Sequence, residues 1–429
     1  MATYTDYIGS VSGGQARDGD YATLDLWQAA SAVSASNGNI YEAVLIDGSA
    51  HYWTDPGTIW NNTKDVNYGI VVRGENSHEG HWTIADRGTS AGAVLTLGQN
   101  VSWGTFGDQS IDLTFRDIIF SATNVNTFYF ANSTVTSGDS GQYSSTISYD
   151  RCMFIHDPVM IQDRLDAGRA FEIPVFFNFR TGYESRNPST GEVSALGKFT
   201  INLTNCVVEQ AGYNLWRMFP NTGPGPQNVE LELNYRGCTW QHSISGVASD
   251  FGGRLGYVDV NQPNSSAIDS ILRINISGCA SDGQPLNKQD IVNFWPSATK
   301  YCNMTDTFWL FNETTFKNQL GELESAADYV HFIYTSSNVN YSTNFGYTGA
   351  SAANTVSFVE NNYNSLERNY RQVAGSLGVD YVTTAAMPSV DITGATRDST
   401  PDAGAFELIT IVVPGDTEIT LQVTPINLY

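Results

Sequence analysis

Basic residues are scarce in this chain, and the scarcity restricts what it can bind. Its 429 residues contain 21 Lys and Arg against 44 Asp and Glu, a formal net charge of −23 at pH 7. Such a surface repels the phosphate backbone of nucleic acids, and no basic patch with interleaved aromatic residues offsets the repulsion. We therefore expect no nucleic-acid partner.

Long apolar runs are also missing. No stretch approaches the roughly eighteen consecutive apolar residues of a membrane-spanning helix, so we expect no membrane partner. The opening residues 1–7 contain neither a positively charged region nor an apolar run. This predicts synthesis in the cytoplasm without a signal peptide.

Motifs of common catalytic sites are missing as well. The chain has no Gly-x-Ser-x-Gly elbow, phosphate-binding loop, dinucleotide fingerprint or Cys-x-x-Cys pair. His78 and His81 could approach one metal ion, but Gly80 and the lack of a further matched ligand favour a solvated turn. We predict neither a cofactor nor a metal ion.

What the chain does contain is a short repeated pattern. Each copy has alternating apolar and polar residues, then two turn-type residues, then a small apolar residue that opens a new strand. The copies are residues 113–120, 147–154, 201–208, 233–240 and 274–279, and the small residues are Ile118, Cys152, Cys206, Cys238 and Cys279. Alternation of period two predicts a strand with one buried face, and the polar pair predicts a bend.

Successive copies of this pattern must stack, because no single copy can bury its own apolar face. The small residue recurs after 34, 54, 32 and 41 positions. A bare β-helix turn needs roughly 20 to 25 residues, so the surplus forms loops or extra strands. The pattern predicts an all-β parallel β-helix with the cysteines inside as free thiols. An antiparallel sandwich is the alternative, although it gives no reason for a cysteine column; Cys302 lies outside the column.

The two ends of this region have the features of caps. Residues 18–30 predict a turn followed by a helix, with Leu26, Ala29, Ala30 and Val33 on the face that covers the first turn of the β-helix. At the far end, residues 391–397 lead into Pro-Asp-Ala-Gly-Ala-Phe-Glu at 401–407. An uncovered end would expose unpaired strand edges, which caps protect.

These two segments carry a family resemblance. Residues 19–27 resemble the entry cap of right-handed parallel β-helix proteins of the pectate-lyase-like superfamily, and residues 401–407 resemble the closing turn of bacterial and phage members. The resemblance implies three regions: an N-terminal arm and helical cap (1–36), a right-handed parallel β-helix (37–407) and a C-terminal extension (408–429). Chains that begin directly at the cap are similar to structural proteins of tailed bacteriophages.

The extension has the pattern of a β-hairpin that docks on another surface. Two β-rich runs flank Pro414 to Thr417, and a lone hairpin is only marginally stable in water. It docks either on its own β-helix or, by strand addition, on a second subunit or a capsid surface. The candidate assembly residues are the apolar ones: Ile409, Ile411, Val413, Ile419, Leu421 and Val423.

Carboxylates are the only candidate catalytic groups. A sugar-cleaving β-helix needs paired carboxylates, or a base beside acidic metal ligands. If the protein is a polysaccharide lyase or glycoside hydrolase, the candidates are Asp150, Asp163, Asp166 and Glu172. The alternative for Asp150 is a structural role beside a ladder of polar side chains, formed at the turn position that Asp117, Arg151 and Asn205 share. The alternative for Asp163 and Asp166 is that they belong to a charged loop.

Three functions remain open. We expect a non-enzymatic bacteriophage virion protein, a capsid decoration, head fibre or short tail fibre on the particle surface. It would be a homotrimer whose partners are other virion proteins such as the major capsid or tail protein. The alternatives are a tailspike-type polysaccharide depolymerase, and a receptor-recognition protein whose exposed aromatic residues bind a host surface glycan. Only about seventeen residues precede the cap, which counts against the tailspike.

Overall fold

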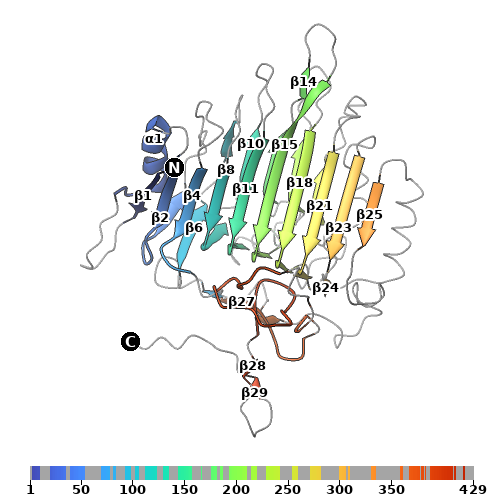
Figure 1. Cartoon of the computed structure of the whole chain (residues 1–429). Coiled ribbons are helices and arrows are strands. Elements are labelled where there is room, and N and C mark those ends of the chain that lie inside the picture. Colours follow the sequence, from blue (N-terminus) through green and yellow to red (C-terminus); the bar gives the residue numbers. More distant parts are fainter. Residues whose placement is uncertain are drawn as a thin grey trace.

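Most of the described residues lie in β-strands, and the largest sheets are built mainly of parallel strands (Figure 1). The computed structural model describes residues 2–9, 20–34, 39–53, 69–77, 81–83, 92–97, 102–105, 112–122, 129–134, 144–156, 166, 175–180, 184–186, 193–209, 214–219, 229–241, 254–258, 271–281, 299–305, 308–309, 330–334, 358–360, 367–376, 378–380, 382, 387–408, 410–411 and 419–420.

Three parallel sheets, together called the stack below, make up most of the described residues. The first sheet contains, in order, β1 (Thr3–Ile8), β2 (Ile40–Leu45), β4 (Gly69–Gly74), β8 (Asp112–Arg116), β11 (Ser144–Asp150), β15 (Val193–Thr204), β18 (Val229–Arg236), β21 (Ile271–Ser277), β23 (Thr299–Thr305) and β25 (Val330–Tyr334). A short strand, β14 (Glu184–Arg186), pairs antiparallel with β15.

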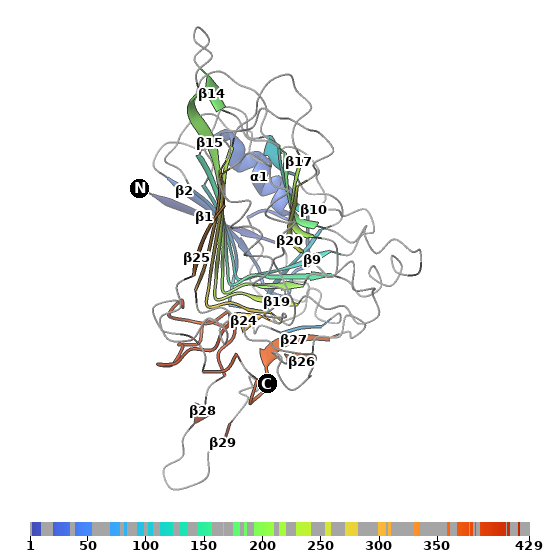
Figure 2. The ribbon, with the colours of Figure 1, turned by 90° about the vertical axis from the view of Figure 1, so that its right-hand side faces the viewer.

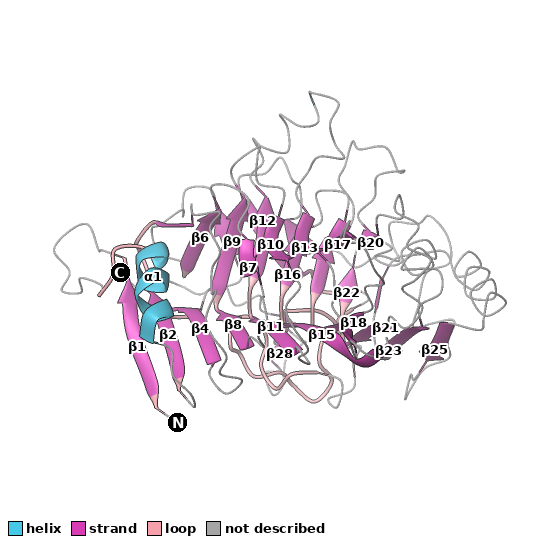
Figure 3. Ribbon diagram, turned by 90° about the horizontal axis from the view of Figure 1, so that it is seen from above, coloured by secondary structure: helices cyan, strands magenta, loops and turns pink. Residues whose placement is uncertain are grey.

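The second and third sheets follow the same order along the chain. The second contains β3 (His51–Trp53), β6 (Ala93–Leu97), β9 (Ile118–Ala122), β12 (Met153–His156), β16 (Val207–Glu209), β19 (Thr239–Gln241), β22 (Ala280–Ser281) and β24 (Phe308–Trp309). The third contains β7 (Ser102–Thr105), β10 (Tyr129–Thr134), β13 (Val175–Arg180), β17 (Asn214–Phe219) and β20 (Arg254–Val258). Figures 2 and 3 show the first and third sheets facing each other, and in Figure 3 their strands follow in sequence order along the molecule.

Equivalent residues of successive repeats lie side by side, as the sequence pattern predicts. Ile147 pairs with Leu113 on one side and with Ile201 on the other, and all three are buried. Aromatic rings stack in the same direction: Phe115 lies on Tyr149 at 5.2 Å between ring centroids. Because side chains alternate along each strand, one face of every repeat fills a continuous interior.

The cysteine column predicted from the sequence is confirmed. Val207 pairs with Met153 and Thr239, so the cysteines that precede these strands occupy successive layers. Cys152, Cys206, Cys238 and Cys279 form no disulfide, and their thiols are buried. The Cys206 thiol donates to the Tyr149 carbonyl oxygen at 3.4 Å. Cys302 lies within β23, paired with Ile274, which places it outside the column.

A bend separates the first sheet from the second in five layers, through residues with left-handed backbone conformation. These residues, called the turn column, have φ values from 50° to 59° and are Asp117, Arg151, Asn205, Gly237 and Gly278. Left-handed conformation is the turn chemistry that Gly, Asn and Asp accept most readily. Each copy of the sequence pattern therefore makes a corner at its two turn-type residues.

The helix α1 (Leu24–Ser34) packs on the β1 end of the stack, but not through the predicted face. Leu24 and Trp27 are buried, whereas Leu26 is 55% exposed. The Trp27 indole N–H donates to Asp6 Oδ2 at 3.0 Å, so the largest side chain both fills space and finds a polar partner on β1. Among the described residues, no helix has the length and apolar character needed to cross a membrane.

The described residues between 358 and 408, called the strap below, do not form a last turn of the stack. The strap contains β26 (Phe358–Glu360) and β27 (Glu367–Gln372), and β27 pairs antiparallel with β5 (His81–Thr83). The later strap residues lie along the outer side of the second sheet, below the stack in Figures 1 and 2. In its described residues, the strap adds no strand to the three parallel sheets.

Candidate functional site

The strap and the second sheet share an apolar core of their own. The contributions of the second sheet are Val94, Ile119, Met153, Ile155, Val207 and Ala280, and those of the strap are Tyr370, Val382, Met387, Ile392, Ala403, Ala405 and Phe406. The second sheet thus buries both faces, the inner one within the stack and the outer one beneath the strap. Removing the strap would expose this apolar strip to water, at roughly 25 cal/mol per Å² of apolar area.

A buried ion pair fastens the first part of the strap. The Arg368 guanidinium donates to the Glu209 carboxylate, and neither side chain is accessible to solvent. The Tyr370 hydroxyl donates to Glu209 Oε1 at 2.6 Å and also lies 2.9 Å from Gln241 Oε1. Buried charges are tolerated when they are paired and hydrogen-bonded, and here Tyr370 supplies the additional bond.

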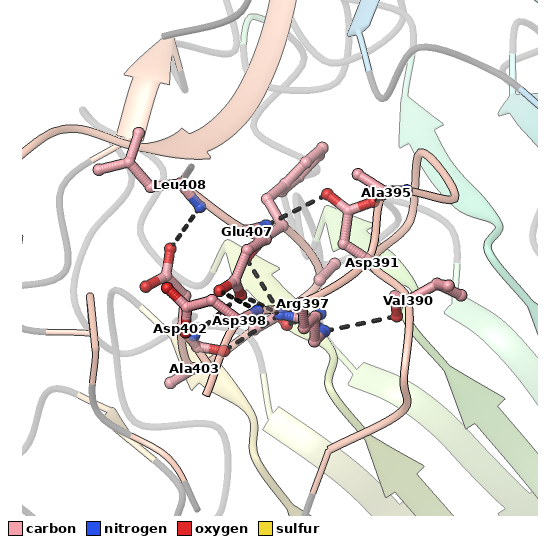
Figure 4. Close-up of polar contacts among 12 residues, drawn as sticks. Val390, Asp391, Ala395, Arg397, Asp398, Asp402, Ala403, Glu407 and Leu408 are labelled. Atoms are coloured by element: carbon pink, nitrogen blue, oxygen red, sulfur yellow. Dashed lines mark hydrogen bonds and ion pairs between the residues drawn. The ribbon is translucent and has the colours of Figure 1, made fainter. Parts of the chain in front are cut away.

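A second buried arginine, Arg397, fastens the last part of the strap (Figure 4). Its guanidinium donates to Glu407 Oε2 at 3.1 Å and to the Gly404 carbonyl at 2.7 Å. It also donates to Asn205 Oδ1 at 3.2 Å, and the Asn205 amide donates to the Val390 carbonyl at 2.8 Å. Asn205 of the turn column therefore both accepts a hydrogen bond from the strap and donates one to it.

Carboxylates hold the strap's own loops in shape. Asp391 accepts the backbone N–H of Ala395 at 3.0 Å and that of Glu407 at 3.2 Å. Asp402 accepts the N–H groups of Asp380 and Leu408 at 2.8 and 2.7 Å. We call Asp391, Arg397, Asp402 and Glu407 the closing cluster. Through Asp402, the cluster also fixes the backbone where the C-terminal extension leaves the strap.

The closing cluster buries more acidic than basic side chains. Asp391, Asp402 and Glu407 are buried with a single guanidinium, that of Arg397. Burial raises the pKa of Asp402 to about 7, although the Asp380 N–H lowers it. Burial likewise raises the pKa of Glu407 and lowers the pKa of Arg397. Desolvation disfavours the charged form of each group.

The candidate catalytic residue Asp150 lies in a ladder of ion pairs. Its carboxylate accepts a hydrogen bond from Arg116 Nε, which lies on the neighbouring strand β8, at 3.0 Å. In the turn column, Arg151 donates to both oxygens of Asp117, at 2.7 and 2.8 Å. This is the arrangement expected if polar side chains at the turn position bond to one another. Asp166 is exposed, and Asp163 and Glu172 lie outside the described residues.

The candidate assembly residues are described in part. Ile411 in β28 (Thr410–Ile411) pairs antiparallel with Ile419 in β29 (Ile419–Thr420), the pairing expected of a hairpin. The other four, Ile409, Val413, Leu421 and Val423, lie outside the described residues, as does His78. Within the described ranges, no group of three or more His, Cys, Asp or Glu residues is arranged to hold a metal ion.

Comparison with known proteins gives no relative for this chain: no family model, curated protein or solved structure matches it. The role of the candidate site must therefore be inferred from the geometry of its residues. Sequence reasoning identified residues 391–407 as a structural motif, but it did not identify Glu209, Arg368 or Tyr370. Nothing in the local sequence of Glu209 distinguishes it from an exposed strand residue.

Proposed function

We propose that the three parallel sheets form a right-handed parallel β-helix and that the chain is a non-enzymatic structural protein of a bacteriophage virion. In this proposal it is a trimeric capsid decoration, head fibre or short tail fibre, bound to the major capsid or tail protein and exposed on the particle. The virion assignment rests on two resemblances: residues 19–27 resemble the entry cap of pectate-lyase-like β-helix proteins, and residues 401–407 resemble the closing turn of bacterial and phage members.

One observation carries the structural role. Four described carboxylates that lie among the catalytic candidates or in the closing motif bind arginines or backbone N–H groups: Asp150, Asp391, Asp402 and Glu407. Asp150 binds Arg116 across neighbouring strands, and Glu407 binds Arg397 across the strap. A carboxylate held in this way fixes geometry, whereas a general acid or base must reach a substrate.

The C-terminal extension is the proposed docking element, and the structure shows at which residue the strap ends and the extension begins. Leu408 is buried and its N–H donates to Asp402, so Leu408 belongs to the strap. We expect a chain that ends at Leu408 to retain the circular dichroism spectrum and unfolding midpoint of the full chain, but to be absent from purified particles. A chain that lacks only residues 424–429 is the control, because it keeps both β-rich runs.

Incorporation of the Leu408-terminated chain at the full-length level would remove the extension from the proposal. The enzymatic alternative has a separate test. We expect no oligosaccharide release when the protein is incubated with the surface polysaccharide of its host. Release of unsaturated or reducing ends would overturn the non-enzymatic proposal, and binding without release would add a host glycan to the partners.

A further inference from the structure

The strand β1 has a backbone edge that faces away from the stack. It is the terminal strand of the first sheet, and its partner in that sheet is β2. The Ile40 N–H donates to the Ala2 carbonyl at 2.9 Å, so the even-numbered residues of β1 direct their backbone groups toward β2. In a parallel pair, the alternate residues direct theirs to the other side. The backbone groups of Thr3, Thr5 and Tyr7 therefore lie along the outer edge.

Only one part of this edge is covered by described residues. The Tyr7 carbonyl accepts the Tyr21 N–H at 3.1 Å, and the Tyr7 N–H donates to Asp20 Oδ2 at 2.9 Å. Thr3 and Thr5 are exposed, and no described residue bonds to their outward N–H and C=O groups. Proteins usually protect such an edge with a charge, a proline, a bulge or a covering segment. Residues 3–5 contain neither charge nor proline, and their pairing with β2 has no bulge.

Exposed apolar side chains accompany this edge. The large exposed apolar residues that the structure describes are Tyr4 on β1, Leu26 on α1 and Tyr52 on β3, each more than half exposed. β3 is the terminal strand of the second sheet, as β1 is of the first. All three residues therefore belong to the same end of the stack. An unpaired edge beside exposed aromatic side chains is typical of a surface that binds another strand.

We propose that this edge joins two copies of the chain end to end, with β1 of one copy antiparallel to β1 of the other. Residues 3–5 read Thr-Tyr-Thr, which is the same in both directions. A two-fold axis between the two Tyr4 residues places Thr3 of each copy opposite Thr5 of the other. Each such pair exchanges two backbone hydrogen bonds. The pairing thus satisfies the outward N–H and C=O groups of Thr3 and Thr5 in both copies.

Side chains and charge favour a second copy as the occupant. The Tyr4 ring stacks on Tyr41 at 5.5 Å between centroids, and in the pair the two Tyr4 side chains meet on the axis. Aromatic pairs and Thr–Thr pairs across antiparallel strands are favourable. A net charge of −23 opposes contact between copies, but residues 2–5 are uncharged. In this register, Asp6 lies opposite Ala2 of the other copy and not opposite a second carboxylate.

The pairing requires neither the strap nor the C-terminal extension, so it does not depend on the virion assignment. A two-fold contact of one surface patch with itself is closed, because it accepts one further copy and no more. It therefore doubles the mass of any assembly that the chain forms through other surfaces. The mass ratio between paired and unpaired forms is two in either case.

Thr5→Pro tests the edge while leaving the pairing with β2 in place. Proline lacks the outward N–H, whereas the bonds to β2 use the groups of the even-numbered residues. Thr5→Val is the control, because it retains the N–H and, like the proline variant, loses the hydroxyl bond to Glu42. By light scattering at the highest soluble concentration, we expect the native chain and Thr5→Val to have twice the mass of Thr5→Pro. Equal masses of the native chain and Thr5→Pro would overturn the proposal.

A disulfide tests the register even if Thr5→Pro fails to fold. Opposite residues that exchange no backbone hydrogen bond have Cα atoms about 4.5 Å apart, within the range of about 4.4–6.8 Å for a disulfide. Tyr4→Cys, in a chain that also has Cys302→Ser, should therefore form a covalent dimer on mild oxidation. The dimer is measured on a denaturing gel without reductant.

Ser399→Cys in the same background is the matched control, because Ser399 is exposed on the strap and away from β1. We expect the Tyr4→Cys chain to give a several-fold higher yield of dimer than the Ser399→Cys chain. Equal yields from the two variants, or a single-chain band alone from Tyr4→Cys, would overturn the proposal.

Discussion

Arg397 and Asn205 are hydrogen-bonded at 3.2 Å although 192 residues separate them in sequence. Asn205 has a left-handed backbone conformation, with φ 50°, and it lies in the turn column between β15 and β16. One residue therefore both turns the chain from the first sheet to the second and binds the strap. The position of this hydrogen bond therefore depends on the bend of that layer.

Replacing Arg397 should weaken the strap more than it disturbs the stack. Arg397→Met leaves the buried carboxylate of Glu407 without its cation, and loss of one partner of a buried pair costs about 3–5 kcal/mol. We expect a destabilisation of that size in urea unfolding, with proteolysis starting in residues 387–408. Arg116→Met is the control, since the Arg116 side chain is 43% exposed and a surface pair contributes about 0–1 kcal/mol. Equal effects of the two variants would contradict a fastening role for Arg397.

Gly237 and Gly48 offer a matched comparison in the turns. Both have positive φ, 59° and 76°, so alanine is strained at either position. A Cβ at Gly237 would lie 2.8 Å from Asn205 Oδ1 and 3.1 Å from Pro388 of the strap, whereas a Cβ at Gly48 meets nothing within 4 Å.

From this difference we expect Gly48→Ala to cost about 1 kcal/mol, the backbone term alone. Gly237→Ala should cost about 1–3 kcal/mol more, because the strap must shift to make room. Thermal unfolding of the two variants beside the native protein measures both effects. A Gly237→Ala chain as stable as Gly48→Ala would show that the strap is not packed against this corner.

The thiols of the cysteine column should not react with thiol reagents in the folded protein. The four thiols are buried, which keeps a reagent from reaching them. Burial also raises the pKa of Cys206 and Cys279, whereas at Cys238 burial is opposed by hydrogen bonds with those two thiols, which lower its pKa. In a Cys302→Ser chain, we expect no thiol to react with an aromatic disulfide reagent at pH 8, and four to react in denaturant. Rapid reaction of even one thiol without denaturant would place it outside the interior of the stack.

Stability should depend on pH through Asp402. The pKa of this carboxyl in the folded protein is about 7, above the usual value of 3.8, because burial disfavours its ionised form. The folded state thus binds more protons than the unfolded state, and stability falls as pH rises from about 4 to about 7. Between pH 5 and pH 8 the expected loss is about 2–3 kcal/mol.

Asp402→Asn isolates this contribution, because asparagine does not titrate. We expect the variant's unfolding free energy to change less between pH 5 and pH 8 than that of the native protein, by the amount given above. Parallel pH profiles of the two proteins would mean that the Asp402 carboxyl is ionised throughout, held by the N–H groups of Asp380 and Leu408.

The sequence was sufficient to predict the layers but not the strap. Cysteines such as Cys206 and Cys238 recur in the sequence because each layer of the stack turns the same corner. A structural feature that is repeated in every layer can therefore be recognised from the sequence. The partnership of Glu209 with Arg368 occurs once, across 159 residues, and leaves no such pattern. The packing of α1 was wrongly predicted for a related reason: helical spacing favoured Leu26, whereas the size of Trp27 and its bond to Asp6 decided which face is buried.

The direction of the hydrogen bonds within the stack has a mechanical consequence. Backbone hydrogen bonds between neighbouring layers run along the length of the molecule. Tension applied along that axis would therefore separate the layers one after another. The strap is anchored at Asn205, at Thr239 and at Gly278, whose carbonyl accepts the Gly404 N–H at 2.8 Å. These anchors lie in three consecutive layers, so the load is shared between them and the layers must part together.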